Sequence, residues 1–71
     1  MTRRQQNLVR RIATGSILFA DQITAREAAE LRAIDDRLFL QSEQVRGEPR
    51  HYFAVDLAAF RAAAQERGIV A

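Results

Sequence analysis

Arginine and glutamine side chains carry most of the recognisable chemistry in this chain. A helix over residues 36–45 would present Arg37, Gln41 and Gln44 together. Arginine pairs bidentately with guanine, and glutamine with adenine, at base edges in the major groove of DNA. These three residues are therefore candidates for reading DNA bases. Asp36 and Glu43 lie in the same segment and oppose this role, because carboxylates are repelled by phosphates.

Basic residues suited to phosphate contact are concentrated near the N-terminus. Residues 1–20 contain four arginines and no acid, whereas residues 21–71 contain seven arginines and nine acids, so a net charge of +2 hides a basic end. Arginine binds phosphate bidentately. The phosphate-contact candidates are Arg3, Arg4, Arg10, Arg11, Arg46, Arg50 and His51. For the four N-terminal arginines, a solvated helix face is an equal alternative.

Catalytic and metal chemistry find little support in the sequence. His51 is the only histidine, cysteine is absent, and no glycine-rich phosphate loop or metal-ligand spacing occurs. Asp35 and Asp36 are adjacent, so on a helix their carboxylates would diverge by about 100° and could not share a proton or a metal. We therefore expect no enzyme activity, no catalytic residues, no metal site and no cofactor.

The composition predicts one small domain over residues 1–71. Hydrophobic residues make up 48% of the chain, but 13 of them are alanine, so few large side chains are available for a core. A chain of this length buries only about 60% of its unfolded surface, and a partner or a second copy would help stabilise it. No apolar run is longer than that of Ile17–Ala20, which is too short to cross a membrane. We expect a cytoplasmic protein with no membrane partner.

Capping boxes mark the starts of two helices. Thr2 with Gln5 predicts a basic N-terminal helix within residues 1–15, which would dock through Leu8, Val9 and Ile12. Thr24 with Glu27 predicts a second helix. The connector 16–23 fits either a short strand or a single helical turn.

A bend is predicted at residues 33–35, where Ala33, Ile34 and Asp35 interrupt the apolar stripe. Asp35 would cap a further helix over 36–45, giving a helix-turn-helix over residues 24–46. One continuous helix from Ala25 to about Val45 is the alternative. Such a helix would have to change its buried face partway along.

The C-terminal third begins with a turn. Arg46-Gly47-Glu48-Pro49 combines glycine and proline, and residues 50–55 favour a short strand or wing. Asp56 caps a final helix over residues 56–67, which Gly68 closes. An apolar tail, residues 69–71, follows.

The segment EAAELRAID, the helix predicted after it and RHYFAVDLAAF together resemble the helix-turn-helix domain of phage and plasmid excisionases and their small regulator relatives. The resemblance covers roughly residues 24–61. It implies a turn at Ala33-Ile34-Asp35, a recognition helix, a β-wing, and a last helix beginning at Asp56, Leu57 and Phe60.

From these observations we expect a mostly α fold of three to four short helices, with a helix-turn-helix and at most a minimal β-wing. The expected function is a small sequence-specific DNA-binding protein of excisionase or accessory transcriptional-regulator type. Its partners would be double-stranded DNA, further copies as a homodimer or cooperative array, and a larger protein such as a recombinase. The alternative is a small α-helical adaptor or inhibitor of mobile-element type that binds a larger protein.

Overall fold

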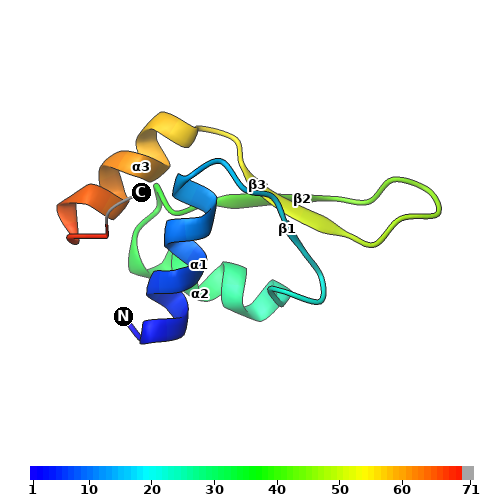
Figure 1. The fold of residues 1–71 in the computed structure, drawn as a ribbon, viewed down its shortest axis with the longest axis horizontal. Coiled ribbons are helices and arrows are strands. Elements are labelled where there is room, and N and C mark those ends of the chain that lie inside the picture. Colours follow the sequence, from blue (N-terminus) through cyan, green and yellow to red (C-terminus); the bar gives the residue numbers. More distant parts are fainter. Residues whose placement is uncertain (70–71) are drawn as a thin grey trace.

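Three helices and a three-stranded antiparallel sheet form the fold (Figure 1). The computed structural model describes residues 1–69. In chain order the elements are α1 (Arg3–Ala13), β1 (Leu18–Phe19), α2 (Ala25–Ile34), β2 (Leu40–Glu43), β3 (His51–Ala54) and α3 (Leu57–Glu66). The strands lie in the order β1–β3–β2. The fold is therefore α+β, and the expectation of a mostly α fold with a helix-turn-helix and a minimal wing is wrong.

The helix starts are set by side-chain caps. Thr2 and Gln5 form a capping box at α1, with a Gln5 N to Thr2 Oγ1 distance of 3.1 Å. Thr24 and Glu27 form the same arrangement at α2, also with a 3.1 Å bond. At α3 the Asp56 carboxylate accepts a hydrogen bond from the Ala59 backbone N–H. Both predicted capping boxes and the Asp56 cap are confirmed.

Residues 36–45 do not form the predicted recognition helix. Helix α2 ends at Ile34, Asp35 is extended, and a turn leads directly into β2. The Asp35 carboxylate does accept a backbone N–H, that of Arg37 at 2.9 Å, but it closes a turn and starts no helix. The buried side chains of Leu38 and Leu40 alternate with exposed neighbours, which is the period of a strand. A continuous helix over 25–45 is excluded as well.

The two faces of the sheet have different surroundings. Leu18, Leu40 and Tyr52 lie on one face and are buried in the core, together with Val9 and Phe60 from the helices. Within residues 1–69, no side chain of the opposite face belongs to the buried core. We call it the open sheet face, and it carries the side chains of Phe19, Gln41, Glu43, His51 and Phe53.

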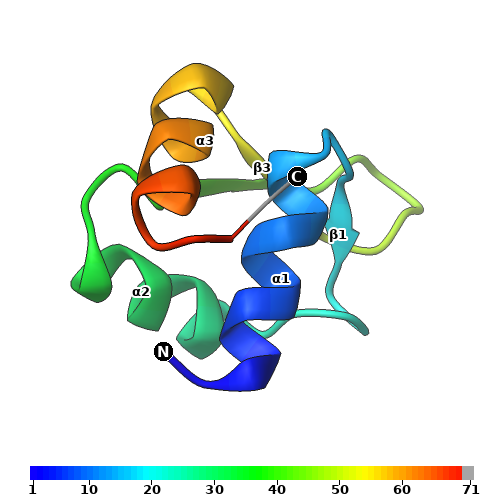
Figure 2. The same ribbon diagram turned by 60° about the vertical axis from the view of Figure 1, so that its left-hand side comes forward.

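Residues 67–69, which follow α3, complete the core. Figure 2 shows them returning toward α1, and Ile69 is buried there. The other two residues of the predicted apolar tail, 70 and 71, lie outside the described part of the chain. Helices α1 and α3 contact each other directly. Arg61 of α3 also donates a hydrogen bond to the carbonyl of Ala13 at 2.6 Å.

The hairpin formed by β2 and β3 extends well beyond the helices along the longest dimension of the molecule, 37 Å (Figure 1). Its strands pair in register from Leu40 with Ala54 to Glu43 with His51. At its end the Glu48 N–H donates to the Val45 carbonyl at 2.9 Å, and Gly47 adopts φ +84°, a conformation that disfavours other residues. The connector 16–23 contains β1, which extends the same sheet on the other side of β3.

Candidate nucleic-acid interface

The four N-terminal arginines are brought together along α1. Arg3, Arg4, Arg10 and Arg11 line one shallow hollow, together with Asn7, Leu8 and Gln22. Because α1 buries Leu8, Val9, Ile12 and Ala13, its arginines are left on the solvent side of the helix. Arg10 Nη1 donates a hydrogen bond to Asn7 Oδ1 at 2.8 Å, and this bond orients the Arg10 side chain. The hollow thus gathers guanidinium groups that can each donate hydrogen bonds to an anion.

One carboxylate contacts this group of arginines. Glu27 forms an ion pair with Arg4, and Arg4 also donates to the Gln22 carbonyl at 3.1 Å. The hydrogen bonds that Arg4 donates to the Glu27 carboxylate, with a smaller contribution from the Thr24 backbone N–H, lower the pKa of Glu27 to about 2. Glu27 in turn raises the pKa of Arg4. Within residues 1–69, the arginines at positions 3, 10 and 11 form no ion pair with a carboxylate and remain available.

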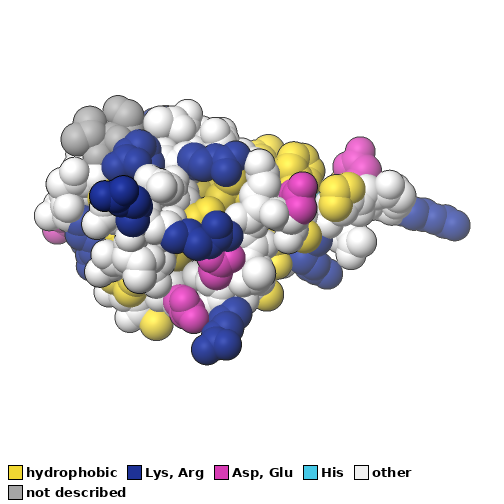
Figure 3. Space-filling model, turned by 60° about the horizontal axis from the view of Figure 1, so that its bottom comes forward, with side chains coloured by type: hydrophobic (Ala, Val, Ile, Leu, Met, Phe, Trp, Pro, Cys, Tyr) yellow, Lys and Arg dark blue, Asp and Glu magenta, His cyan; other side chains and the backbone are white. Residues whose placement is uncertain are grey.

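The hairpin carries two further phosphate-contact candidates in different places. Arg46 lies in the turn at the hairpin end, and Figure 3 shows a basic side chain at the farthest point of the molecule. Arg50 lies nearer the body, where its Nη1 donates to Ser42 Oγ at 3.0 Å. Arg46 is therefore exposed at the hairpin end, whereas Arg50 lines the groove between the sheet and α2.

The three base-reading candidates do not lie on a common helix. Arg37 is held by two carboxylates, those of Asp35 and Glu66. Gln41 lies on the open sheet face in β2, and Gln44 follows β2, with its Nε2 3.4 Å from the Glu48 carbonyl. The prediction that one helix presents all three is wrong, because the segment between them is a turn and a strand.

Arg37 is engaged too strongly to be a free base contact. Its hydrogen bonds lower the pKa of Asp35 well below the usual range, and Arg67 adds a further bond at 3.0 Å. Asp35 and then Glu66 raise the pKa of Arg37 above that of an ordinary arginine. Through these ion pairs Arg37 links the turn after α2 to the end of α3.

His51 lies on the open sheet face between two phenylalanines. Its ring centroid is 6.2 Å from that of Phe19 and 5.9 Å from that of Phe53, and its Nε2 is 3.8 Å from a Glu43 oxygen. Its side chain is largely covered, so it is less accessible to phosphate than an exposed wing residue would be.

The sequence analysis missed Arg32 and Tyr52. They line a groove between α2 and the sheet together with Arg50, although Arg32 lies 18 residues before Arg50 and 20 before Tyr52 in the chain. Only the sheet pairing brings them together. The sequence did contain a signal for the hairpin. Every second residue from Leu38 to Ser42 could face the core, as could every second residue of 50–54, and the turn at Gly47 lies between the two segments.

No family model, no curated protein and no solved structure matches this chain. In the part of the chain described here, no group of three or more histidine, aspartate or glutamate residues is arranged to hold a metal ion. Across residues 1–69, no helix is both long enough and apolar enough to cross a membrane.

Proposed function

We propose that this protein is a small accessory protein that binds double-stranded DNA in the cytoplasm. The observation that carries the proposal is the hollow along α1, where four arginines converge and a single carboxylate is already paired with Arg4. Solubility alone does not require four arginines with no acid among them. A phosphate backbone is the ligand whose charge and geometry suit such a set.

In this proposal α1 supplies the backbone contacts. Arg3, Arg10 and Arg11 donate hydrogen bonds to phosphate oxygens, while Arg4 fixes the position of α1 on α2 through Glu27. Phosphate contacts position a protein on the duplex and carry little sequence information. The affinity should therefore fall steeply as the salt concentration rises.

The hairpin supplies the base contacts that the predicted recognition helix was expected to make. A two-stranded β-ribbon fits the major groove, which is about 12 Å wide. Arg46 at the hairpin end can pair with guanine, and the nearby Gln44 with adenine. A regulator or excisionase of this kind acts by occupying or bending its site, as a homodimer or cooperative array, or by recruiting a larger protein such as a recombinase.

A salt titration of duplex binding, followed by fluorescence anisotropy, tests the proposal. A plot of log affinity against log salt has a negative slope, and each lost phosphate contact makes that slope shallower by about 0.9. The double variant Arg3→Gln/Arg11→Gln should therefore have a slope that is shallower by about 1.8. The double variant Arg26→Gln/Arg32→Gln, which removes the same charge from α2, is the matched control and should leave the slope unchanged.

Two results contradict the proposal. The first is a wild-type protein whose weak binding shows no salt dependence. The second is an equal change in both double variants, which would mean general attraction between a basic protein and DNA and no defined contact along α1.

A protein-binding adaptor or inhibitor is the second candidate, and the open sheet face favours it. Phe19 on this face is 40% exposed, and Ile17 and Val55, which lie just outside β1 and β3, are 50% and 58% exposed. Exposed apolar side chains gathered on one face commonly mark protein contacts. Under this alternative the protein shows no duplex binding that depends on the α1 arginines.

A further inference from the structure

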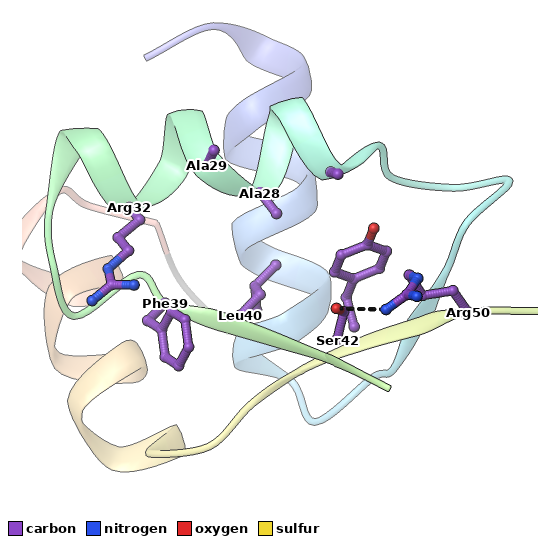
Figure 4. A pocket seen from close by; sticks show the side chains of 9 residues that line it. Ala28, Ala29, Arg32, Phe39, Leu40, Ser42 and Arg50 are labelled. Atoms are coloured by element: carbon purple, nitrogen blue, oxygen red, sulfur yellow. Dashed lines mark hydrogen bonds between the residues drawn. The ribbon is translucent and has the colours of Figure 1, made fainter. Parts of the chain in front are cut away.

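A groove between α2 and the edge of the sheet has the features of a peptide-binding site. Its lining contains three alanines of α2, the side chains of Phe39 and Leu40, and the polar residues Arg32, Ser42, Arg50 and Tyr52. Figure 4 shows Leu40 and Ser42 rising from β2 toward Ala28 and Ala29 on α2, with Arg32 at one end of the row and Arg50 at the other. The groove is thus apolar in the middle and basic at both ends.

The strand that borders this groove has a free edge. Strand β2 pairs only with β3 in the described sheet, so its outer backbone N–H and C=O groups face away from the ladder. An edge strand beside a helix is the arrangement in which an extended peptide adds to a sheet while its side chains enter the adjoining groove. The alanines of α2 keep this space open, because larger side chains at these positions would fill it.

The polar groups of the groove are poised for an acidic ligand. No carboxylate is among the residues that line it. Arg32 lies over the Phe39 ring, with its guanidinium carbon 4.6 Å from the ring centroid, and Arg50 is oriented by Ser42. Tyr52, of which 6% is exposed, completes the lining between Ser42 and Arg50.

We propose that this groove binds an extended segment of a partner protein that carries an acidic residue at each end of a short apolar stretch. The segment adds to the free edge of β2, its apolar side chains cover Ala28, Ala29 and Leu40, and its two carboxylates pair with Arg32 and Arg50. Nucleic acid fits this groove less well, since the apolar floor and the strand edge match a peptide backbone and not a row of phosphates. The inference does not depend on duplex binding along α1.

The test uses the full-length protein and a fluorescein-labelled, acetylated peptide of sequence Asp-Thr-Leu-Thr-Leu-Thr-Asp. In an extended chain its Asp and Leu side chains share one face. The control peptide replaces both Asp residues by Lys. We expect at least about tenfold tighter binding of the acidic peptide, corresponding to the loss of two charge-assisted contacts in the control.

Three protein variants locate the site. Arg32→Gln and Arg50→Gln should each weaken peptide binding several-fold, and Arg26→Gln, which removes the same charge from the outer side of α2, should not. Ala29→Phe should abolish binding by filling the groove without changing any charge. Circular dichroism checks that each variant folds. In amide NMR spectra of the wild-type protein, the peptide should shift the signals of Ala28, Ala29, Leu40 and Ser42.

Several outcomes overturn the inference. Equal binding of the acidic and lysine peptides would do so, as would retained binding in folded Ala29→Phe or amide shifts that map to the open sheet face. If a single-stranded or duplex oligonucleotide displaces the peptide and loses affinity in the Arg32→Gln variant, the groove is a phosphate site. The α1 variants Arg3→Gln/Arg11→Gln should leave peptide binding unchanged, which separates this test from that of duplex binding.

Discussion

Asp35 holds together the turn that follows α2. Its carboxylate accepts hydrogen bonds from the backbone N–H of Arg37 at 2.9 Å, from the Arg37 guanidinium at 2.8 and 3.1 Å, and from Arg67 at 3.0 Å. Arg37 also pairs with Glu66 near the end of α3. These charged groups form a network, and networks stabilise a protein more than isolated surface pairs do.

Replacing Arg37 by glutamine should lower stability and leave duplex affinity unchanged. The substitution removes the groups that bond to Asp35 and Glu66, while the α1 arginines stay in place. We expect a lower urea midpoint for Arg37→Gln than for Arg26→Gln, whose ion pair with Glu30 is solvent-exposed. If the folded Arg37→Gln variant loses duplex binding while its urea midpoint is unchanged, Arg37 contacts DNA directly.

Glu27 should make the stability of the protein depend on acid pH. Its pKa in the folded protein is about 2, below the ordinary value of 4.5. Between these values the unfolded chain binds more protons than the folded one, so the free energy of unfolding falls as the pH drops from about 4.5 toward 2. This stabilisation is fully present above the ordinary value. Urea unfolding at a series of pH values measures it.

The matched variants for this experiment are Glu27→Gln and Glu30→Gln. The first removes the titrating group that joins α1 to α2 and should make the acid limb of the stability curve shallower, leaving the part that Asp35 contributes. The second lies on the same helix in an exposed pair with Arg26 and should leave the curve as it is in the wild type. An acid limb that is identical in all three proteins would show that other carboxylates account for it.

At the scale of elements, the parts specified by local chemistry were predictable. The caps at Thr2, Thr24 and Asp56 fixed where the three helices begin, because each satisfies backbone N–H groups within four residues of itself. The end of α2 near Ile34 was likewise visible in the sequence. These are interactions between near neighbours in the chain.

Strand β2 was not predicted, because it depends on a distant partner. Residues 36–45 contain few β-branched side chains, and their apolar positions were read as a helix following α2. Pairing with β3, which joins Gln41 to Phe53 twelve positions later in the chain, decides the conformation instead. For the same reason the arginines of α1 were found from the sequence, whereas the groove that joins Arg32 to Tyr52 was not.

The two residues of β1 provide a test of which sheet face is covered. Leu18 is fully buried against the helices, whereas Phe19 is 40% exposed on the open sheet face. Leu18→Ala should cost about 2–5 kcal/mol, since it leaves a cavity in the core. Phe19→Ala should cost about 1 kcal/mol or less, because it removes only an edge contact with His51. Urea denaturation compares the two, and equal costs would mean that both faces are covered.

At the scale of the whole molecule, the arginine hollow and the peptide groove lie on different surfaces. The hollow is lined by α1 and Gln22, and the groove is lined by α2, β2 and β3, with no residue in common. An accessory protein that occupies DNA and recruits a larger protein needs two such separate surfaces.

Both ligands should therefore bind at the same time. We expect saturating acidic peptide to change duplex affinity by less than about threefold, which corresponds to a coupling free energy below the range typical of allosteric sites. Anisotropy of a labelled duplex, measured with and without unlabelled peptide, checks this. Mutual exclusion of the two ligands would place them on one overlapping surface.

The hairpin end lies beyond the core, and this separation has a practical consequence. The last buried side chain before the turn belongs to Leu40, and Tyr52 is the first after it, so residues 44–50 stabilise no other element by burial. Foreign sequence introduced between Arg46 and Gly47 would be accommodated, since exposed turns tolerate insertions. A fluorophore-binding tag or a crosslinking residue grafted there would report on whatever the protein approaches, with its scaffold intact.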